Sequence, residues 1–378
     1  MATVAAKPAA SVPFFDPAPS FDWLRAALLD DISDLIESGA FTNGPHVARF
    51  EASFASYCGA RECVGVGSGL DALRLGLLAA GLEKGDGVIV PANTFIATFE
   101  AVTQAGGVPV VADVTEADYN LDPAAVEAAV TERTRLLLPV HLYGQMADMT
   151  ALAATAARHG LTIIEDACQA HGARRDGLRS GTTGVAGAFS FYPAKNLGAM
   201  GDAGALVTND PDLASRVRML REHGQRAKYA HDYEGYTARL DTIQGLVLLR
   251  KLPHLDRWNE ERRALALLYS DALAGVGDLV LPPIAEESEP VWHLYVVRTE
   301  DPQQLSDYLA SRGIGTGRHY PQPPHLSPAY ASLGYRTGSF PVAEALAQEV
   351  VSLPLFPGMG ECSVAAVVDA VGDYFRRG

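Results

Sequence analysis

The sequence predicts an α/β protein with a mainly parallel sheet, followed by a smaller α+β region. Three observations lead to this prediction. The chain has 378 residues, a length that suits two or three domains. Between residues 50 and 210, short apolar runs alternate with segments of helical period, and the runs lack the polar alternation of half-exposed strands. Near Asp241 the pattern changes, and long helices become prominent.

The apolar runs are the expected strands of the sheet. Because they carry no alternating polar residues, we expect them to be buried on both faces, and the helices between them indicate β-α-β units. In chain order, the runs include Val88–Val90, Val108–Ala112, Leu136–Val140, Leu161–Ile164 and Ala205–Thr208, and the helical segments include Leu70–Ala80, Pro123–Val130 and Met149–His159.

The region after Asp241 is expected to cover one edge of the sheet. We predict an N-terminal arm and helix (1–45), a large domain (46–250) and a small C-terminal domain (251–378). In open α/β sheets, ligands bind beyond the carboxyl ends of the strands, so polar residues there are the candidates for a site. The expected late elements are the helices Thr242–Lys251, ended by Pro253, and Trp258–Leu273, the strand Trp292–Arg298, the helix Gln303–Arg312, a Pro-rich loop His319–Pro328 and the helix Val364–Arg376.

Composition excludes several classes of protein. With 45 acidic and 30 basic residues, the net charge of −15 would repel phosphate backbones, so we expect no nucleic-acid binding. No run of about 18 uncharged apolar residues is present, so we expect no membrane-spanning helix. The four cysteines form no CxxC pair, which suits reduced thiols in the cytoplasm and no metal site. Residues 1–20 lack the features of a secretory signal and are expected to form a loose arm.

A glycine-rich segment, Gly65–Leu73, lies between an expected strand and a helix. Glycines let the backbone approach an anion, and a helix N-terminus offers free N–H groups, so the segment predicts a phosphate cradle. Its G-x-G-x-G spacing differs from the G-x-G-x-x-G of dinucleotide-binding folds, which argues against an NAD dehydrogenase. A tight strand–helix turn without a ligand is the alternative.

Two carboxylates, Glu165 and Asp166, end another expected strand, and Gln169 and His171 follow. A carboxylate in this place can hold a cation or keep a ring nitrogen protonated, and a nearby amide can hydrogen-bond the same ring. The alternative is that the carboxylates cap the following helix by accepting from its free N–H groups.

Lys195 is the only lysine between Lys84 and Lys228, and small and apolar residues surround it. Such surroundings lower the pKa of a lysine, and the neutral amine is the form that attacks an aldehyde. Ser190, five residues earlier, could donate to a phosphate. A surface lysine in a turn is the alternative.

These three segments share one chemical logic. Pyridoxal phosphate (PLP) requires a lysine that forms an imine, an acid partner for its ring nitrogen and an anchor for its phosphate. Asp166 precedes Lys195 by 29 residues, enough chain to bring both to one pocket. The sequence therefore predicts a PLP site.

From about Phe14 to the C-terminus, the chain resembles the DegT-type sugar aminotransferases, PLP enzymes of fold type I. The resemblance implies a mainly parallel seven-stranded sheet sandwiched by helices, with the smaller α+β domain at the C-terminus. Several matching segments in this order make it specific. They are GSGLDAL (67–73), PANTFIAT (91–98), PVHLYGQ (139–145), IIEDACQAHGA (163–173), SFYPAKNLGAMGDAGA (190–205), RLDTIQ (239–244), GIGTGRHYP (313–321) and SLPLFPGM (352–359).

The resemblance also implies roles for individual residues. Lys195 would bind the cofactor covalently and move a proton, and Asp166 would keep the pyridine nitrogen protonated. Phe95 would stack on one ring face, with Gln169 against the other face or the ring hydroxyl. The implied cofactor-binding residues are Ser68, Gly69, Leu70, Phe95, Asp166, Gln169, Ser190, Lys195 and Thr237, and the implied sugar-binding residues are His319, Tyr320, Tyr229 and His231.

The activity implied is transamination of a nucleotide-linked keto sugar with L-glutamate as the amino donor. The segments 195–204 and 221–231 resemble members that aminate C3, which favours a TDP-3-keto-6-deoxyhexose over a C4-keto sugar. A scyllo-inosose aminotransferase is a further alternative. A dehydratase on this scaffold has histidine in place of Lys195, and a purely regulatory protein would not need Lys195, Asp166 and Ser190 together.

The resemblance further implies a homodimer with shared active sites. Family members usually carry Asn-Ser before Arg-Leu-Asp, in a loop that reaches the neighbouring subunit's phosphate. Here that loop reads Gly235–Arg239, in which Thr237 offers a shorter hydroxyl side chain. From the loop around Tyr229–Arg239, we expect Thr237, together with Tyr229 and His231, to enter the partner's site; a solvated surface loop is the alternative.

Overall fold

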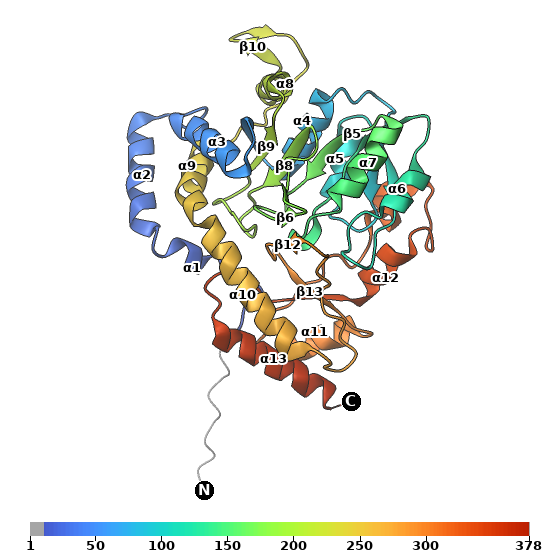
Figure 1. Cartoon of the computed structure of the whole chain (residues 1–378). Helices are drawn as coiled ribbons and strands as arrows, with labels where there is room; N and C mark the ends of the chain where they lie inside the picture. Colours follow the sequence, from blue (N-terminus) through green and yellow to red (C-terminus); the bar gives the residue numbers. More distant parts are fainter. Residues whose placement is uncertain (1–10, 378) are drawn as a thin grey trace.

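The computed structural model describes residues 11–377, so half of the expected N-terminal arm, residues 1–10, lies outside them (Figure 1). Its large sheet has seven strands in the order β1-β9-β8-β5-β4-β2-β3. Only β9 runs antiparallel to its neighbours, so the expected mainly parallel sheet is confirmed. The strands are β1 (Glu62–Val66), β2 (Gly87–Pro91), β3 (Val108–Ala112), β4 (Thr134–Leu137), β5 (Thr162–Asp166), β8 (Ala186–Ser190) and β9 (Gly204–Thr208).

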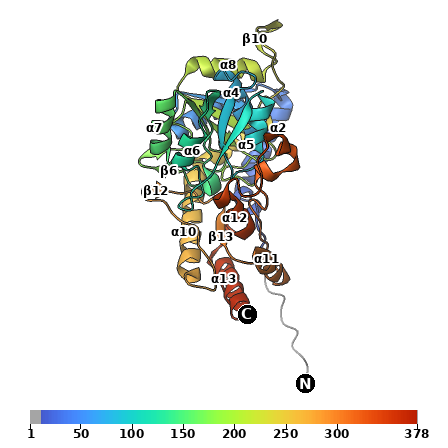
Figure 2. The same cartoon turned by 90° about the vertical axis from the view of Figure 1, so that its right-hand side faces the viewer.

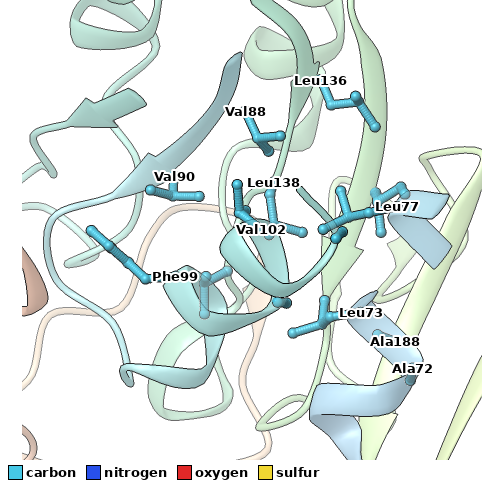
Figure 3. Packing of buried hydrophobic residues seen from close by; sticks show 14 of the residues in the cluster. Ala72, Leu73, Leu77, Val88, Val90, Phe99, Val102, Leu136, Leu138 and Ala188 are labelled. Carbon is cyan, nitrogen blue, oxygen red and sulfur yellow. The ribbon is translucent and has the colours of Figure 1, made fainter. Parts of the chain in front are cut away.

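Helices cover both faces of this sheet. Along β2, Val88 and Val90 pack into one core with α4 and α5, whereas Ile89 between them packs into another with α6 and α7. Figure 3 shows the first of these cores. Bounds are α3 (Pro45–Cys58), α4 (Gly69–Ala79), α5 (Ala97–Gln104), α6 (Pro123–Ala129), α7 (Met149–His159), α8 (Pro211–Arg221) and α9 (Thr242–Lys251).

The remaining elements lie around the edges of the sheet. The short helix α1 (Ala18–Phe21) leads into α2 (Arg25–Ser38), which packs on α9. A hairpin of β10 (Gln225–Ala227) and β11 (Ala230–His231) projects beyond α8 (Figure 1). A further small sheet joins β6 (Arg174–Arg175), β7 (Leu178–Arg179) and β12 (Ser288–Glu289).

A second core forms at the C-terminal end of the chain, where β13 pairs antiparallel with β14 and α10, α11 and α13 surround them (Figure 2). In contrast, α12 packs on the core of the large sheet. The boundaries at residues 45 and 250 stay a prediction. The bounds are α10 (Leu255–Leu273), β13 (Tyr295–Arg298), α11 (Pro302–Ser311), α12 (Pro341–Glu349), β14 (Val350–Leu353) and α13 (Glu361–Phe375).

Some local expectations are wrong. The strand expected from Trp292 begins at Tyr295, because Trp292 has a left-handed backbone with φ of 48°. The run expected to continue to Val140 ends at Leu137, two residues before a proline. Val108 is 42% exposed because β3 is the edge strand of the sheet. The loop 319–328 contains a short 3₁₀ turn, Pro324–Leu326.

Candidate active site

A cavity of about 490 Å³ lies beyond the carboxyl ends of β1, β5 and β8. It brings together most of the residues that the sequence singles out, from both the sheet and the C-terminal region. Of the expected residues, those in its wall are Ser68, Gly69, Leu70, Phe95, Asp166, Gln169, Ser190, Lys195, His319 and Tyr320.

Lys195 lies in a tight turn, but its side chain lines the cavity. Its backbone N–H donates to the carbonyl of Tyr192 at 2.8 Å. The turn needs a glycine at Gly198, since a Cβ there would lie 2.2 Å from the carbonyl oxygen of Pro193. Burial lowers the pKa of Lys195 below its ordinary value, while Cys168 and Asp166 oppose the shift. The lowered pKa makes the neutral, nucleophilic amine more accessible than in an ordinary lysine.

Asp166, at the end of β5, presents a held carboxylate to the same cavity. The Thr98 hydroxyl donates to its Oδ2 at 3.0 Å, and the backbone N–H of Cys168 donates to Oδ1 at 3.2 Å. Asp166 is buried, with 6% of the residue exposed. Asp166 thus caps the following turn and still lines the cavity, so the two interpretations of its role are compatible.

Glu165 points to the opposite face of β5, because successive side chains of a strand alternate. It is fully buried, and its Oε2 lies 2.8 Å from Nε2 of His141. It also accepts three backbone N–H groups, from Gly181, Thr183 and Gly184, at 2.6–2.8 Å. Glu165 therefore anchors the chain before β8 and does not line the cavity.

The glycine-rich turn brings the N-terminus of α4 to the cavity. Ser68 caps the helix by accepting from the N–H of Asp71 at 3.0 Å. A Cβ on Gly69 would lie 2.7 Å from Cβ of Ser190, so the glycine lets this turn contact the end of β8. The first N–H groups of a helix have no intrahelical partner. Together with Ser190, they form a cradle suited to an anion.

Gln169 is held by hydrogen bonds from two sides. The backbone N–H of Tyr143 donates to its Oε1 at 2.8 Å, and its Nε2 donates to the hydroxyl of Tyr320 at 3.1 Å. The Tyr320 ring lies 5.4 Å from the half-exposed ring of Phe95. These contacts join the sheet side of the cavity to its C-terminal side.

The C-terminal side of the wall is made of neutral groups. Burial, assisted by the charge of Lys195, lowers the pKa of His319 to about 4. Burial also raises the pKa of the Tyr320 hydroxyl and lowers that of His293 well below its ordinary value. Near neutral pH, this wall offers hydrogen bonds without charge.

Several residues of the wall were not predicted from the sequence. His293 was hidden in an apolar run interpreted as strand, although a histidine in such a run was a usable signal. Thr98 stands in a segment that carries the family resemblance. The missed residues are Leu73, Thr94, Ala97, Thr98, Glu100, Val140, Cys168, Tyr192, Ala194, Asp202 and His293.

Three expected residues do not line this cavity. Tyr229 and His231 belong to the hairpin segment around β10 and β11, and this hairpin projects from the body of the chain (Figure 2). Tyr229 is 82% exposed. Thr237 is exposed, and its hydroxyl lies 3.3 Å from Nε2 of His223. Within one chain, these residues are therefore separate from Lys195, and their entry into a partner's site stays a prediction.

Comparison with known proteins identifies the family. Residues 23–372 match the model of the DegT/DnrJ/EryC1/StrS aminotransferase family. The chain belongs to this family. It is an aminotransferase, and its cofactor is PLP.

Two curated relatives cover almost the whole chain. It is 50% identical to the dTDP-3-amino-3,4,6-trideoxy-alpha-D-glucose transaminase of Streptomyces venezuelae, over 97% of each chain. It is 51% identical to the erythromycin biosynthesis sensory transduction protein EryC1 of Saccharopolyspora erythraea, over 92% of this chain and 94% of that protein.

A solved structure, that of S. venezuelae DesV in complex with a ketimine intermediate, superimposes with a TM-score of 0.95. The two chains are 50% identical, and the match covers 97% of this chain and 99% of the DesV chain. Together with the sheet order, this likeness confirms the expected fold. No helix among residues 11–377 is long and apolar enough to cross a membrane.

The described residues fit PLP. A lysine with a lowered pKa, a held carboxylate and a helix N-terminus converge on one cavity. At Gly69, a Cβ would fill the cradle from the side of Ser190. The lysine, the carboxylate and the helix N-terminus correspond to the covalent anchor, the acid partner and the phosphate anchor that the cofactor requires.

Proposed function

We propose that this enzyme transfers the amino group of L-glutamate to C3 of a TDP-linked 3-keto-6-deoxyhexose, to form an amino sugar of a natural product. The convergence of Lys195, Asp166 and the N-terminus of α4 on one cavity carries the aminotransferase chemistry. The name of the Streptomyces relative, a transaminase of a 3-amino sugar linked to dTDP, supports C3 and the nucleotide. All four cysteines are free, which supports a cytoplasmic enzyme.

Asp166 and Lys195 perform the central steps. When bound, PLP supplies a conjugated ring that withdraws electrons from the reacting carbon. Asp166 keeps the ring nitrogen protonated, and Thr98, itself paired with Thr94 at 2.8 Å, holds the carboxylate in place. Nζ of Lys195 would hold the cofactor between turnovers and, when free, would carry the proton to or from the substrate carbon.

Binding residues surround these two groups. The backbone N–H groups of Gly69 and Leu70, with the hydroxyl of Ser190, bind the phosphate. Phe95 and Gln169, which line the cavity, would flank the ring. His319 and Tyr320 recognise the sugar, and the surrounding protein excludes water from the reacting carbon.

A spectral experiment on the purified enzyme tests this function. The protein is expected to be yellow, and borohydride treatment followed by mass spectrometry should place the reduced cofactor on Lys195. L-glutamate should convert the PLP form to the amine form. The amino sugar dTDP-3-amino-3,4,6-trideoxy-α-D-glucose, the product of the proposed reaction, should likewise convert the PLP form to the amine form, which is the sugar half-reaction run in reverse.

Matched substrates separate the alternatives. Rapid conversion with the 3-amino sugar nucleotide and slow conversion with a TDP-4-amino-6-deoxy sugar would support C3. The opposite preference would establish C4, and conversion with scyllo-inosamine alone would establish an inosose aminotransferase. A colourless protein that fails to bind added PLP would contradict the whole proposal.

The active sites are shared within a homodimer. The hairpin β10–β11 projects from the body of the chain (Figure 1). Its exposed side chains Arg226, Lys228 and Tyr229 suit contact with a partner. Thr237 contributes a hydroxyl to the partner's phosphate site, and Tyr229 and His231 reach its sugar. This assembly would place three otherwise solvated residues at an active site.

A mixing experiment tests the shared site. A Lys195→Ala chain is combined, after mild dissociation, with a chain whose hairpin residues 225–234 are replaced by a short glycine linker. Because each mixed dimer would keep one intact site, part of the activity should return. A mixture of wild-type with Lys195→Ala chains controls for exchange. No recovery despite exchange, or a monomer by light scattering, would contradict the proposal.

A further inference from the structure

Ser352 is a polar residue in an otherwise apolar strand, β14, whose four residues are all buried. A buried hydroxyl requires a hydrogen-bond partner, and alanine would fit such a strand at no polar cost. The side-chain partner of Ser352 is Nδ1 of His319, 2.8 Å from its Oγ. The serine therefore serves a histidine of the active-site wall.

The backbone of Ser352 and two neighbouring residues, Gly317 and Phe14, hold the His319 ring in place. Ser352 and Gly317 exchange two backbone hydrogen bonds, of 2.8 and 3.1 Å. A Cβ on Gly317 would lie 2.7 Å from Cε1 of His319, so the glycine lets the ring pack against this bridge. Phe14 stacks on the ring at a centroid distance of 5.7 Å. With Nδ1 engaged, Nε2 is the ring nitrogen left for the cavity.

The direction of the hydrogen bond follows from the hydroxyl proton. Among residues 11–377, His319 is the one side chain that bonds the Ser352 hydroxyl. If Nδ1–H donated to the serine, the O–H of the serine would be buried without an acceptor. If instead the serine donates to a bare Nδ1, this proton is satisfied. The low pKa of His319 agrees with an imidazole that is neutral and carries one proton.

We infer that Ser352 is a positioning residue that fixes His319 as the Nε2–H tautomer, so that this N–H donates to an oxygen of the acceptor sugar. The inference rests on the proposed function, since it takes the sugar as the group facing His319. The neighbouring wall residue His293 offers a contrast, because its buried Nδ1 has no hydrogen-bond partner within the described chain.

The test compares two half-reactions that start from the same PLP form. One uses L-glutamate, and the other uses dTDP-3-amino-3,4,6-trideoxy-α-D-glucose. In Ser352→Ala, we expect the apparent affinity for the amino sugar to fall about five- to tenfold. The glutamate half-reaction should stay within about twofold of wild type, because glutamate does not use this N–H. Ser352→Thr, which keeps the hydroxyl, should restore sugar affinity.

Ser270→Ala is the matched control. The Ser270 hydroxyl also belongs to the C-terminal region, but it does not line the cavity; it forms a hydrogen bond of 2.9 Å with the Tyr295 hydroxyl. Removing it should leave both half-reactions unchanged. Equal slowing of both half-reactions in Ser352→Ala would show a merely structural serine and overturn the inference. So would a sugar affinity that stays at the wild-type value.

Nitrogen NMR of the histidine-labelled holoenzyme tests the tautomer directly. The signals of His319 are assigned by their loss in His319→Gln. A protonated Nε2 with a bare Nδ1 is expected in the wild type, and a protonated Nδ1 would overturn the inference. If wild-type enzyme fails with glutamate, the proposed function is wrong. If it reacts with glutamate but Ser352→Ala leaves the sugar unaffected, only the inference is wrong.

Discussion

The two walls of the cavity differ in charge and in origin. The sheet wall presents two ionisable groups. Asp166 ends β5, and Lys195 follows β8 of the same sheet. The C-terminal wall presents His293, His319 and Tyr320, and burial keeps each of them neutral near pH 7.

This difference separates chemistry from recognition. Proton transfer needs a base whose pKa lies near the working pH, and burial shifts the pKa of Lys195 downward from its ordinary value, in that direction. A sugar presents hydroxyl groups, which neutral donors and acceptors recognise without the desolvation cost of a charge. Changes in the sheet wall should therefore affect both half-reactions, and changes in the C-terminal wall should affect mainly one substrate.

Lys195→Ala should have the largest effect. The change removes both the covalent anchor and the proton carrier, so turnover should fall by about 10³-fold or more with either substrate. PLP should still bind through the phosphate cradle and Asp166, but gel filtration in denaturant after borohydride should find no cofactor on the chain. Turnover near the wild-type rate would show that another group carries the proton.

Asp166→Asn should come next. The amide keeps the shape of the side chain and can still be held by Thr98, but it no longer keeps the ring nitrogen protonated. We expect both half-reactions to slow on the order of 10²-fold, with little change in thermal stability. Stopped-flow absorbance measures the two rates. A variant with normal rates would reduce Asp166 to the cap of its turn.

Glu165→Gln is the counterpart on the other face of β5 and should affect stability, not chemistry. The carboxylate accepts three backbone N–H groups, and an amide offers one oxygen where two are used. We expect a loss of about 2–4 kcal/mol in the free energy of unfolding, with rates per folded enzyme retained. Denaturant unfolding with active-site titration separates the two. A stable but inactive variant would reverse the assignment of the two carboxylates.

The sheet wall was predictable because its signals are local. Lys195, Asp166 and Gly69 each stand beside an apolar strand, and parallel strands bring their carboxyl ends together. The register of β5 decides which of Glu165 and Asp166 faces the cavity. The residue pattern left this open, and the family resemblance assigned the role to Asp166.

The C-terminal wall was less predictable because its order depends on distant contacts. His293 reaches the cavity only because the chain turns at Trp292, and that turn is held by the buried Arg262, whose guanidinium donates to the Trp292 carbonyl at 3.2 Å. Ser352 lies in a segment that carries the family resemblance, but nothing near it in sequence indicates His319 as its partner. The entry of the hairpin residues into a partner's site stays a prediction, because it depends on contacts between two chains.

Replacing His171, which lies in the core behind the sheet wall, should have the smallest effect. Its side chain has no exposed surface and packs against the rings of Phe189 and Phe191 at 5.4 and 5.6 Å. Burial lowers its pKa from 6.5 to about 3, so the unfolded chain binds a proton here at a higher pH than the folded chain. This contribution to stability is therefore fully present above pH 6.5 and is lost as the pH falls toward 3.

In the variant His171→Leu, that part of the acid sensitivity disappears because leucine does not titrate. The midpoint of thermal unfolding should therefore fall less steeply between pH 6.5 and 4 than in the wild type, while the glutamate half-reaction at pH 7.5 stays unchanged. His319→Gln, which removes a partly exposed imidazole from the other wall, should flatten the same curve less, because its ring is less deeply buried. Differential scanning calorimetry across this range measures all three proteins. A curve for His171→Leu that is parallel to the wild type would mean that the imidazole charges without opening the core, and the contrast between the buried and the cavity histidine would then be lost.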